Sequence, residues 1–247
     1  MRKPVIFLLH GAWHSSSCWS LLIPQLEALG HCVQAPDLPG HGSNRADAAT
    51  ISLNKYSGYI TQLIDNYDNK VLLVGHSMSG MVISQVAENI PQKIERLVYL
   101  SAYLPRHQQS LFDLIASNAA ASEPAPIEGV MQLSADKRSC SIADETIAPL
   151  FYNRCPDTHR NQIPRSFPAQ PVLPLSGRVK LSAENFGQIP KTYICCQEDL
   201  VIPIAHQRHM IKQQHCDEMI QLDADHSPFL SCTQQLASVL HSSSLPA

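Results

Sequence analysis

Six short apolar runs recur along the chain and constrain its fold more than any other feature. They show no alternation of apolar and polar residues, which is typical of strands covered on both faces. Amphipathic stretches separate them; one has Leu22, Leu26 and Leu29 at spacings of four and three residues and ends at Gly30, as a helix with a C-terminal glycine does. The runs lie at residues 5–9, 32–35, 71–74, 97–100, 192–196 and 219–222. This rhythm predicts an α/β fold with a mostly parallel sheet of about six strands and helices on both faces.

The alternation of strand runs and helical stretches stops between residues 103 and 190, where 10 of the 18 prolines lie and no strong strand run occurs. Apolar positions within 111–115 and 147–151 are spaced for short helices, and the prolines between them suit turns. We therefore predict a core domain of residues 1–102 and 191–247, with residues 103–190 inserted as a helical cap (lid) over the site. A second independent domain is the alternative, but the segment offers few periodic apolar positions for a core of its own.

Composition excludes several classes of protein. With 44% hydrophobic residues, 16% charged residues and a net charge of −3, the chain is too apolar for disorder and lacks the basic surplus of nucleic-acid-binding proteins. No stretch approaches the roughly 18 apolar residues of a membrane span, so we expect no membrane partner. The start, Met1 to Lys3 and then residues 5–9, imitates a signal peptide, but the apolar run stops at His10-Gly11 without a cleavage site.

Eight cysteines are spread thinly, and no two are spaced as C-x-x-C. We expect reduced thiols that behave as small hydrophobic residues, and hence a cytoplasmic protein. Whether the chain is a monomer or a homodimer stays open.

The segment from Lys70 to Gly80 carries the clearest chemical signal. An apolar strand run leads into Gly75-His76-Ser77-Met78-Ser79, and a helical pattern follows. A serine at a strained strand-to-helix turn of the G-x-S-x-G type exposes its hydroxyl beside a helix N-terminus, which favours a developing oxyanion. Ser79 stands where the motif has glycine; it is small enough to fit, and whether it has a role stays open. We predict Ser77 as the nucleophile.

A serine nucleophile needs a base, and the base needs an acid to orient it. Asp199 follows one late strand run and His226 follows the next, so both lie at the carboxyl edge of the sheet, where Ser77 also lies. We assign Asp199 as the acid and His226 as the base. Glu198 remains a rival for the acid, and Asp225 is expected at a surface or in a turn. For His10, His14 and His76 we expect packing or hydrogen bonding.

A second oxyanion donor usually comes from the loop after an early strand. Residues 10–14 follow the first run directly, and we predict the backbone N–H groups of Ala12 and Met78 as the two donors.

With these residues the chain resembles the α/β-hydrolase superfamily, in the branch of plant methylesterases, hydroxynitrile lyases and related bacterial esterases. The likeness runs through almost the whole chain, and least through residues 103–190. Its motifs, in order, are Leu9-His10-Gly11-Ala12-Trp13-His14, Trp19, residues 22–31, Asp37-Leu38-Pro39-Gly40-His41-Gly42, Val74-Gly75-His76-Ser77-Met78, Glu198-Asp199 and Asp225-His226.

The resemblance implies an α/β-hydrolase fold and a carboxylic-ester hydrolase with Ser77, Asp199 and His226 as its triad. In the related lyases a threonine follows the first-loop histidine and a lysine follows the catalytic histidine. Here these positions hold Gly11 and Ser227, which argues against cyanohydrin cleavage of that type.

We therefore expect a serine esterase that acts on small, uncharged, hydrophobic or aromatic esters, methyl esters among them, without cofactor or metal. The expected substrate-binding residues follow from nearness to the catalytic loops or the cap. They are Trp13, Tyr103, Phe151, Phe229 and Leu230. The alternatives are a ligand receptor on a hydrolase scaffold, a hydroxynitrile lyase, and an enzyme that transfers the acyl group to an acceptor other than water.

Overall fold

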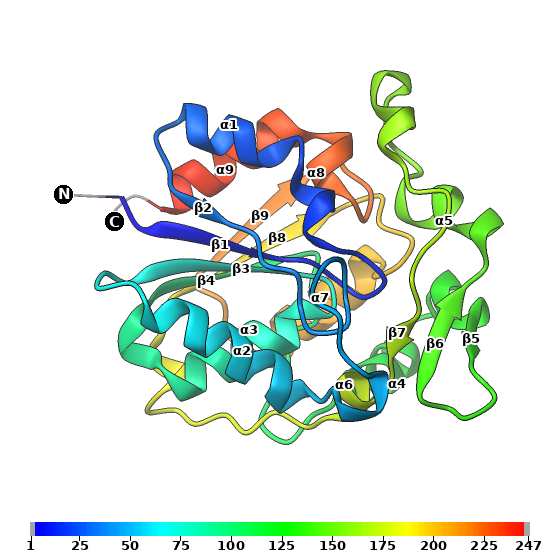
Figure 1. Cartoon of the computed structure of the whole chain (residues 1–247), viewed down its shortest axis with the longest axis horizontal. Coiled ribbons are helices and arrows are strands. Elements are labelled where there is room, and N and C mark those ends of the chain that lie inside the picture. Colours follow the sequence, from blue (N-terminus) through cyan, green and yellow to red (C-terminus); the bar gives the residue numbers. More distant parts are fainter. Residues whose placement is uncertain (1–2, 245–247) are drawn as a thin grey trace.

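A computed structural model of the chain describes residues 3–244 (Figure 1). Its central element is a six-stranded sheet in the order β2-β1-β3-β4-β8-β9, in which every neighbouring pair is parallel. The strands are β1 (Val5–Leu9), β2 (Val33–Gln34), β3 (Val71–His76), β4 (Ile94–Leu100), β8 (Lys191–Cys196) and β9 (Glu218–Leu222). Each predicted apolar run falls on one of these strands, so the predicted parallel sheet is confirmed.

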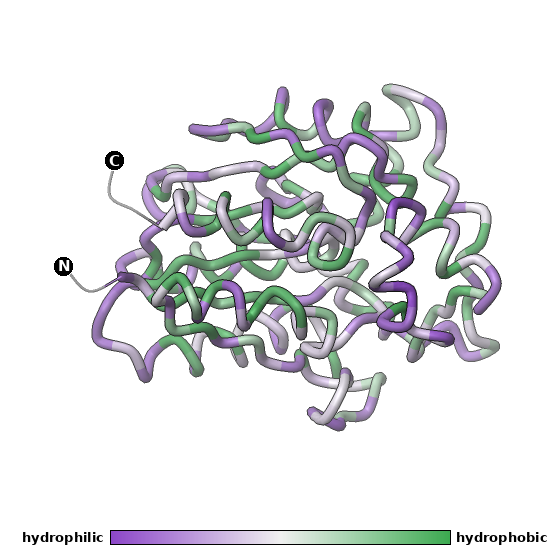
Figure 2. The backbone as a smooth tube through the Cα atoms, turned by 90° about the horizontal axis from the view of Figure 1, so that it is seen from above, coloured by the Kyte–Doolittle hydropathy of each residue, from purple (hydrophilic) through white to green (hydrophobic). Residues whose placement is uncertain are grey.

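Helices cover both faces of this sheet. Helices α1 and α9 pack together on one face, and α2 and α3 on the other (Figure 1). The core helices are α1 (Leu22–Ala28), α2 (Leu53–Asp65), α3 (Ser79–Asn89), α7 (Ile204–Gln213), α8 (Pro228–Ser231) and α9 (Thr233–Ser243). Strands β3 and β8 are buried along their whole length, and Figure 2 shows hydrophobic residues gathered through the centre of the molecule.

Local signals account for where several helices begin and end. Helix α1 stops where Gly30 adopts a φ of 82°, and the N–H groups of Gly30 and His31 donate to carbonyl oxygens of the last helical turn. Helix α2 starts after Ser52, whose hydroxyl accepts a hydrogen bond from the N–H of Lys55. Short 3-10 helices occupy several loops: η1 (Ser16–Trp19), η2 (Ala48–Thr50), η3 (Pro91–Lys93), η4 (Pro126–Gly129), η5 (Asp157–Gln162) and η6 (Phe186–Gln188).

Residues 103–190, which we call the cap segment, lie between β4 and β8 in the sequence. Most of the segment lies beyond the carboxyl ends of the core strands, and its last part, after α6, runs back past α2 and α3 to the start of β8 (Figure 1). The segment contains α4 (Leu111–Ala121), α5 (Asp144–Phe151) and α6 (Leu173–Ser176), the first two where the apolar spacing predicts helices. It also contains a three-stranded antiparallel sheet of β5 (Met131–Leu133), β6 (Ser139–Ile142) and β7 (Gln170–Pro171), which the purely helical prediction missed. Its buried side chains join those of the core in one continuous hydrophobic cluster.

Two further features bear on the sequence-based expectations. Within residues 3–244, no helix is long and apolar enough to cross a membrane. All eight cysteines are free thiols, and Cys140, Cys195 and Cys196 are buried.

Candidate active site

Ser77 lies in the tight turn between β3 and α3. Its φ of 55° is in the left-handed region that residues other than glycine rarely adopt. Strand and helix approach closely because small residues flank the turn. A Cβ atom on Gly75 would lie 2.7 Å from the carbonyl oxygen of Ser79, and one on Gly80 would collide with the carbonyl oxygen of Tyr103. The turn therefore places Ser77 at the carboxyl edge of the sheet, directly before the N-terminus of α3.

Ser79, at the position of the motif glycine, has a defined contact. Its side chain is buried, and its hydroxyl donates a hydrogen bond of 2.5 Å to the backbone carbonyl oxygen of His10. This bond ties the start of α3 to the first loop, residues 10–14. Because Ala12 lies in that loop, Ser79 links the two segments that carry the predicted oxyanion donors.

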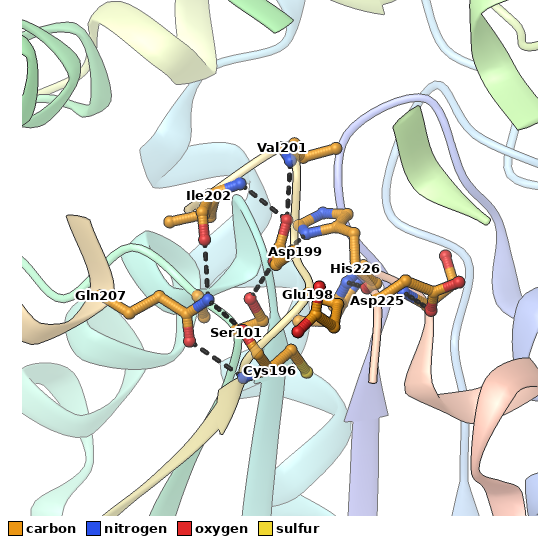
Figure 3. Close-up of polar contacts among 12 residues, drawn as sticks. Ser101, Cys196, Glu198, Asp199, Val201, Ile202, Gln207, Asp225 and His226 are labelled. Carbon is orange, nitrogen blue, oxygen red and sulfur yellow. Dashed lines mark hydrogen bonds and ion pairs between the residues drawn. The ribbon is translucent and has the colours of Figure 1, made fainter. Parts of the chain in front are cut away.

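His226 and Asp199 form a buried pair (Figure 3). The Nδ1 atom of His226 lies 2.7 Å from Oδ2 of Asp199, and the two side chains are 1% and 0% exposed. The same carboxylate oxygen accepts from the hydroxyl of Ser101, and Oδ1 accepts from the N–H groups of Val201 and Ile202. A carboxylate with these donors is held in one orientation. It fixes the proton of His226 on Nδ1 and leaves the Nε2 lone pair available.

Sequence reasoning did not single out Ser101, although a signal was present. It directly follows β4, so it lies at the same edge of the sheet as Asp199 and Ser77.

The two other acidic residues near the pair have different surroundings. Glu198 is exposed, and its backbone carbonyl, rather than its carboxylate, accepts from the side chain of Asn153. Asp225 is fully buried and accepts from Ser231 Oγ and from the N–H groups of Ser227 and Arg154. Burial raises the pKa of its carboxyl. Asp225 has the expected role in a turn, because its carboxylate accepts from the N–H of Ser227, two residues later. It does not lie at the surface, because three donors satisfy its carboxylate in the interior.

Ala12, Ser77 and Met78 line one cavity. Ala12 and Met78 are buried, and within residues 3–244 neither backbone N–H donates to a loop or turn acceptor. Two unengaged amides beside a serine hydroxyl are an arrangement that would suit an oxyanion. Gly11 makes room for this approach, since a Cβ atom there would lie 2.8 Å from Cβ of Ser77.

The Ser77 cavity is small, about 30 Å³, and enclosed almost entirely by apolar side chains. Of the predicted binding residues, Trp13 and Tyr103 line it. The other lining residues, besides Ala12, Ser77 and Met78, come from the cap segment and from the loop after Asp199: Leu111, Phe112, Ile115, Ile127, Met131, Leu175 and Val201. The apolar spacing predicted a helix at α4, but it did not indicate which face of that helix lies towards Ser77.

The remaining predicted binding residues lie elsewhere. Phe151 packs edge-on against the ring of His226, with ring centroids 5.6 Å apart. Phe229 and Leu230 line a separate cavity of about 510 Å³, which Trp13 also lines. They lie there because α8 packs against η1 and η5. The structure therefore does not bring these three side chains into the Ser77 cavity.

Neutral histidines surround the site. His76 Nε2 donates to the backbone carbonyl oxygen of His226 at 2.8 Å, and the two rings have centroids 4.6 Å apart. Burial lowers the pKa of His10 to about 3 and of His14 to about 4, and it holds the pKa of His76 well below its usual value. These rings act as hydrogen-bonding groups, as expected. Among the described residues, no group of three His, Cys, Asp or Glu side chains is arranged to hold a metal ion.

Comparisons with known proteins identify the family of the chain. Residues 6–239 match the model of the alpha/beta hydrolase family. Methylesterase 3 of Arabidopsis thaliana is 31% identical, over 97% of this chain and 95% of its own; Methylesterase 7 of that plant is 29% identical, over 94% and 93%.

Two solved structures are also similar. A pyrethroid hydrolase from Sphingobium faniae has a TM-score of 0.86 and 26% identity, covering 97% of this chain and 96% of its own. Polyneuridine aldehyde esterase has a TM-score of 0.87 and 25% identity, covering 98% and 100%. The chain therefore belongs to the alpha/beta hydrolase family, in the branch that includes the plant methylesterases.

Proposed function

We propose that this protein is a serine carboxylic-ester hydrolase with Ser77 as nucleophile, His226 as base and Asp199 as the acid that orients it. The observation that carries the proposal is the buried contact between His226 and Asp199 beside the strained Ser77 turn. His76 connects the Ser77 turn to His226, because it directly precedes Ser77 and donates a hydrogen bond to the backbone carbonyl oxygen of His226. The similar proteins include a methylesterase and an esterase, which supports ester hydrolysis as the reaction.

The reaction runs in two steps. The hydroxyl oxygen of Ser77 attacks the ester carbonyl carbon while Nε2 of neutral His226 accepts the hydroxyl proton. Asp199 stabilises the imidazolium that forms, and the N–H groups of Ala12 and Met78 stabilise the oxyanion. His226 then protonates the departing alcohol. Water attacks the acyl-enzyme by the same route and releases the carboxylic acid.

The lining of the Ser77 cavity supports small, uncharged, hydrophobic or aromatic esters as substrates, methyl esters among them. It contains no charged side chain that would pair with a charged substrate. Burying an unpaired charge there would cost free energy. Burying apolar groups is favourable by about 25 cal/mol for each Å² of surface removed from water. Trp13 and Tyr103 would contact the substrate, and the cap segment would select among acyl groups.

The hydroxynitrile lyase alternative is disfavoured by the packing at Gly11. A threonine there would place its Cβ 2.8 Å from Cβ of Ser77 and 3.0 Å from Nδ1 of His76, so the loop would have to shift. The receptor alternative predicts tight binding with negligible turnover. Acyl transfer to another acceptor predicts that added alcohols divert the product. The cytoplasmic location and the number of subunits stay predictions.

The proposal is tested by comparing wild type with Ser77→Ala on p-nitrophenyl acetate, butyrate and octanoate and on aromatic methyl esters. We expect serine-dependent turnover, with kcat lowered about 10³-fold or more in the variant because the nucleophile is gone. The dependence on chain length then measures the acyl space.

Ser238→Ala is the matched control, since Ser238 is exposed on α9, away from the site. It should keep full activity. Activity of Ser77→Ala within tenfold of wild type would rule Ser77 out as the nucleophile.

A further inference from the structure

The first loop, residues 10–14, contains a second strained position. Trp13 has a φ of 61°, which is rare for a bulky residue. Such a strained conformation persists only where the surroundings hold it. Ala12, whose N–H we propose as an oxyanion donor, is the preceding residue. The groups that hold the Trp13 N–H therefore act one peptide unit away from the Ala12 N–H and restrain its direction.

Two of these groups come from the cap segment. The backbone N–H of Trp13 donates to Oε1 of Gln170 at 3.4 Å, and its indole N–H donates to the carbonyl oxygen of Cys140 at 3.1 Å. Gln170 and Cys140 are direct partners in the pairing of β7 with β6. The small cap sheet thus offers one acceptor to the backbone of Trp13 and another to its side chain.

A chain of hydrogen bonds connects Gln170 to the far end of the same loop. Nδ1 of His41 lies 3.0 Å from the carbonyl oxygen of His14, so it must carry the proton and donate. Nε2 of His41 is then the acceptor for the hydroxyl of Tyr56, at 3.0 Å. The Tyr56 oxygen in turn accepts from Nε2 of Gln170 at 3.4 Å.

This chain leaves only one orientation for the Gln170 amide. Its Nε2 donates to Tyr56 and, at 2.9 Å, to the carbonyl oxygen of Pro171, so Oε1 must face the N–H of Trp13. The side chain is 0% exposed. Water cannot replace the amide there, and a residue without these groups would leave buried polar partners unsatisfied.

We propose that Gln170 is a positioning residue for the oxyanion hole. It holds the backbone of Trp13 directly and the carbonyl of His14 through Tyr56 and His41, and so keeps the Ala12 N–H directed at the reacting carbonyl. The oxyanion hole of this enzyme is therefore assembled by core and cap together. The inference rests on the proposed ester hydrolysis.

The test compares wild type, Gln170→Met and Gln162→Met. Methionine keeps the length of the side chain but neither accepts from Trp13 nor donates to Tyr56. Gln162 is an exposed glutamine of the cap segment and serves as the matched control. We measure kcat and KM for p-nitrophenyl butyrate per active serine, counted by fluorophosphonate titration. We also measure inhibition by an alkyl trifluoromethyl ketone, whose serine adduct carries an oxyanion, and by the corresponding alcohol, which forms no adduct.

For Gln170→Met we expect kcat about tenfold lower or more, with KM within about threefold, because a whole oxyanion donor is worth about 10²- to 10³-fold. Affinity for the trifluoromethyl ketone should fall by a similar factor, and affinity for the alcohol should not change. Gln162→Met should match wild type.

Tyr56→Phe covers the case in which Gln170→Met does not fold. It removes only the hydroxyl between Gln170 and His41, and we expect the same pattern with a smaller loss. If kcat per active serine and the ketone-to-alcohol affinity ratio match wild type in every variant that folds, the proposal is overturned and Gln170 only stabilises the fold. Wild type without serine-dependent turnover would instead overturn the proposed function, and this inference with it.

Discussion

Asp199 and Glu198 are adjacent in the sequence but have opposite surroundings. Asp199 is buried and receives donors on both carboxylate oxygens, one of them Nδ1 of His226. Glu198 is exposed, and its backbone carbonyl makes the contact to the cap segment. A carboxylate that orients a histidine must be rigid and shielded from water, and Asp199 meets both conditions.

We expect Asp199→Asn to lower kcat by about 10³-fold or more, because the amide would favour the wrong tautomer of His226. Glu198→Gln should stay within about threefold of wild type. The measurement is kcat for p-nitrophenyl butyrate, with fluorophosphonate labelling to count active serines. Greater damage from Glu198→Gln than from Asp199→Asn would show that the acid has been assigned to the wrong residue.

At the scale of elements, two glycines differ in whether their surroundings leave room for a side chain. Gly11 allows the first loop to lie against the Ser77 turn, with Cβ of Ser77 and the His76 ring at the position that a side chain would take. Gly58 lies inside α2, where an added Cβ would meet nothing within 4 Å. One glycine is required by packing, and the other only weakens its helix.

We therefore expect Gly11→Ala to lower kcat/KM by about 10²-fold, because the loop with the proposed oxyanion donor Ala12 must move. Gly58→Ala should raise the free energy of unfolding by about 0.5–1 kcal/mol, because alanine is the better helix former, and should leave activity unchanged. Urea unfolding and esterase kinetics on both variants check the pair. Full activity in Gly11→Ala would mean that the loop tolerates the displacement.

The core elements could be predicted from the sequence, whereas those of the cap segment could be predicted only in part. Strands buried on both faces leave continuous apolar runs, and the inner strands β1, β3, β4 and β8 show this pattern. The edge strands β2 and β9 are only partly buried, but shorter apolar runs marked them as well. The strands β5, β6 and β7 are two to four residues long, too short to show a period. They form because they pair with one another, and the sequence pattern carries no trace of that pairing.

At the scale of the whole molecule, buried histidines make stability depend on pH. The pKa of His10 falls to about 3 and that of His14 to about 4 in the fold, and that of His76 falls well below 6.5. In the unfolded chain each pKa is near 6.5, so below this pH the unfolded state binds protons that the folded state does not. The stability that these neutral histidines contribute is therefore fully present above about pH 6.5 and is lost as the pH falls towards 4.

We expect the free energy of unfolding to decrease between pH 7.5 and 5 by about 1.4 kcal/mol per histidine for each pH unit below 6.5. The raised pKa of Asp225 opposes this trend, because the folded state then binds the extra proton. Urea unfolding at pH 7.5, 6 and 5 measures the slope. Equal stability at the three values of pH would contradict the neutral, buried state of these rings.

The sequence by itself determined the parallel sheet, the strand-to-helix turn at Ser77, and the choice of Ser77, Asp199 and His226 as candidates. These features leave local patterns, because strand burial, turn geometry and position after a strand are properties of short segments. Tertiary structure alone decided which side chains enclose the Ser77 cavity and that Gln170 meets Trp13 across 157 residues of sequence. Contacts between distant segments arise only when the chain packs, because no local pattern fixes which cap residue faces which loop.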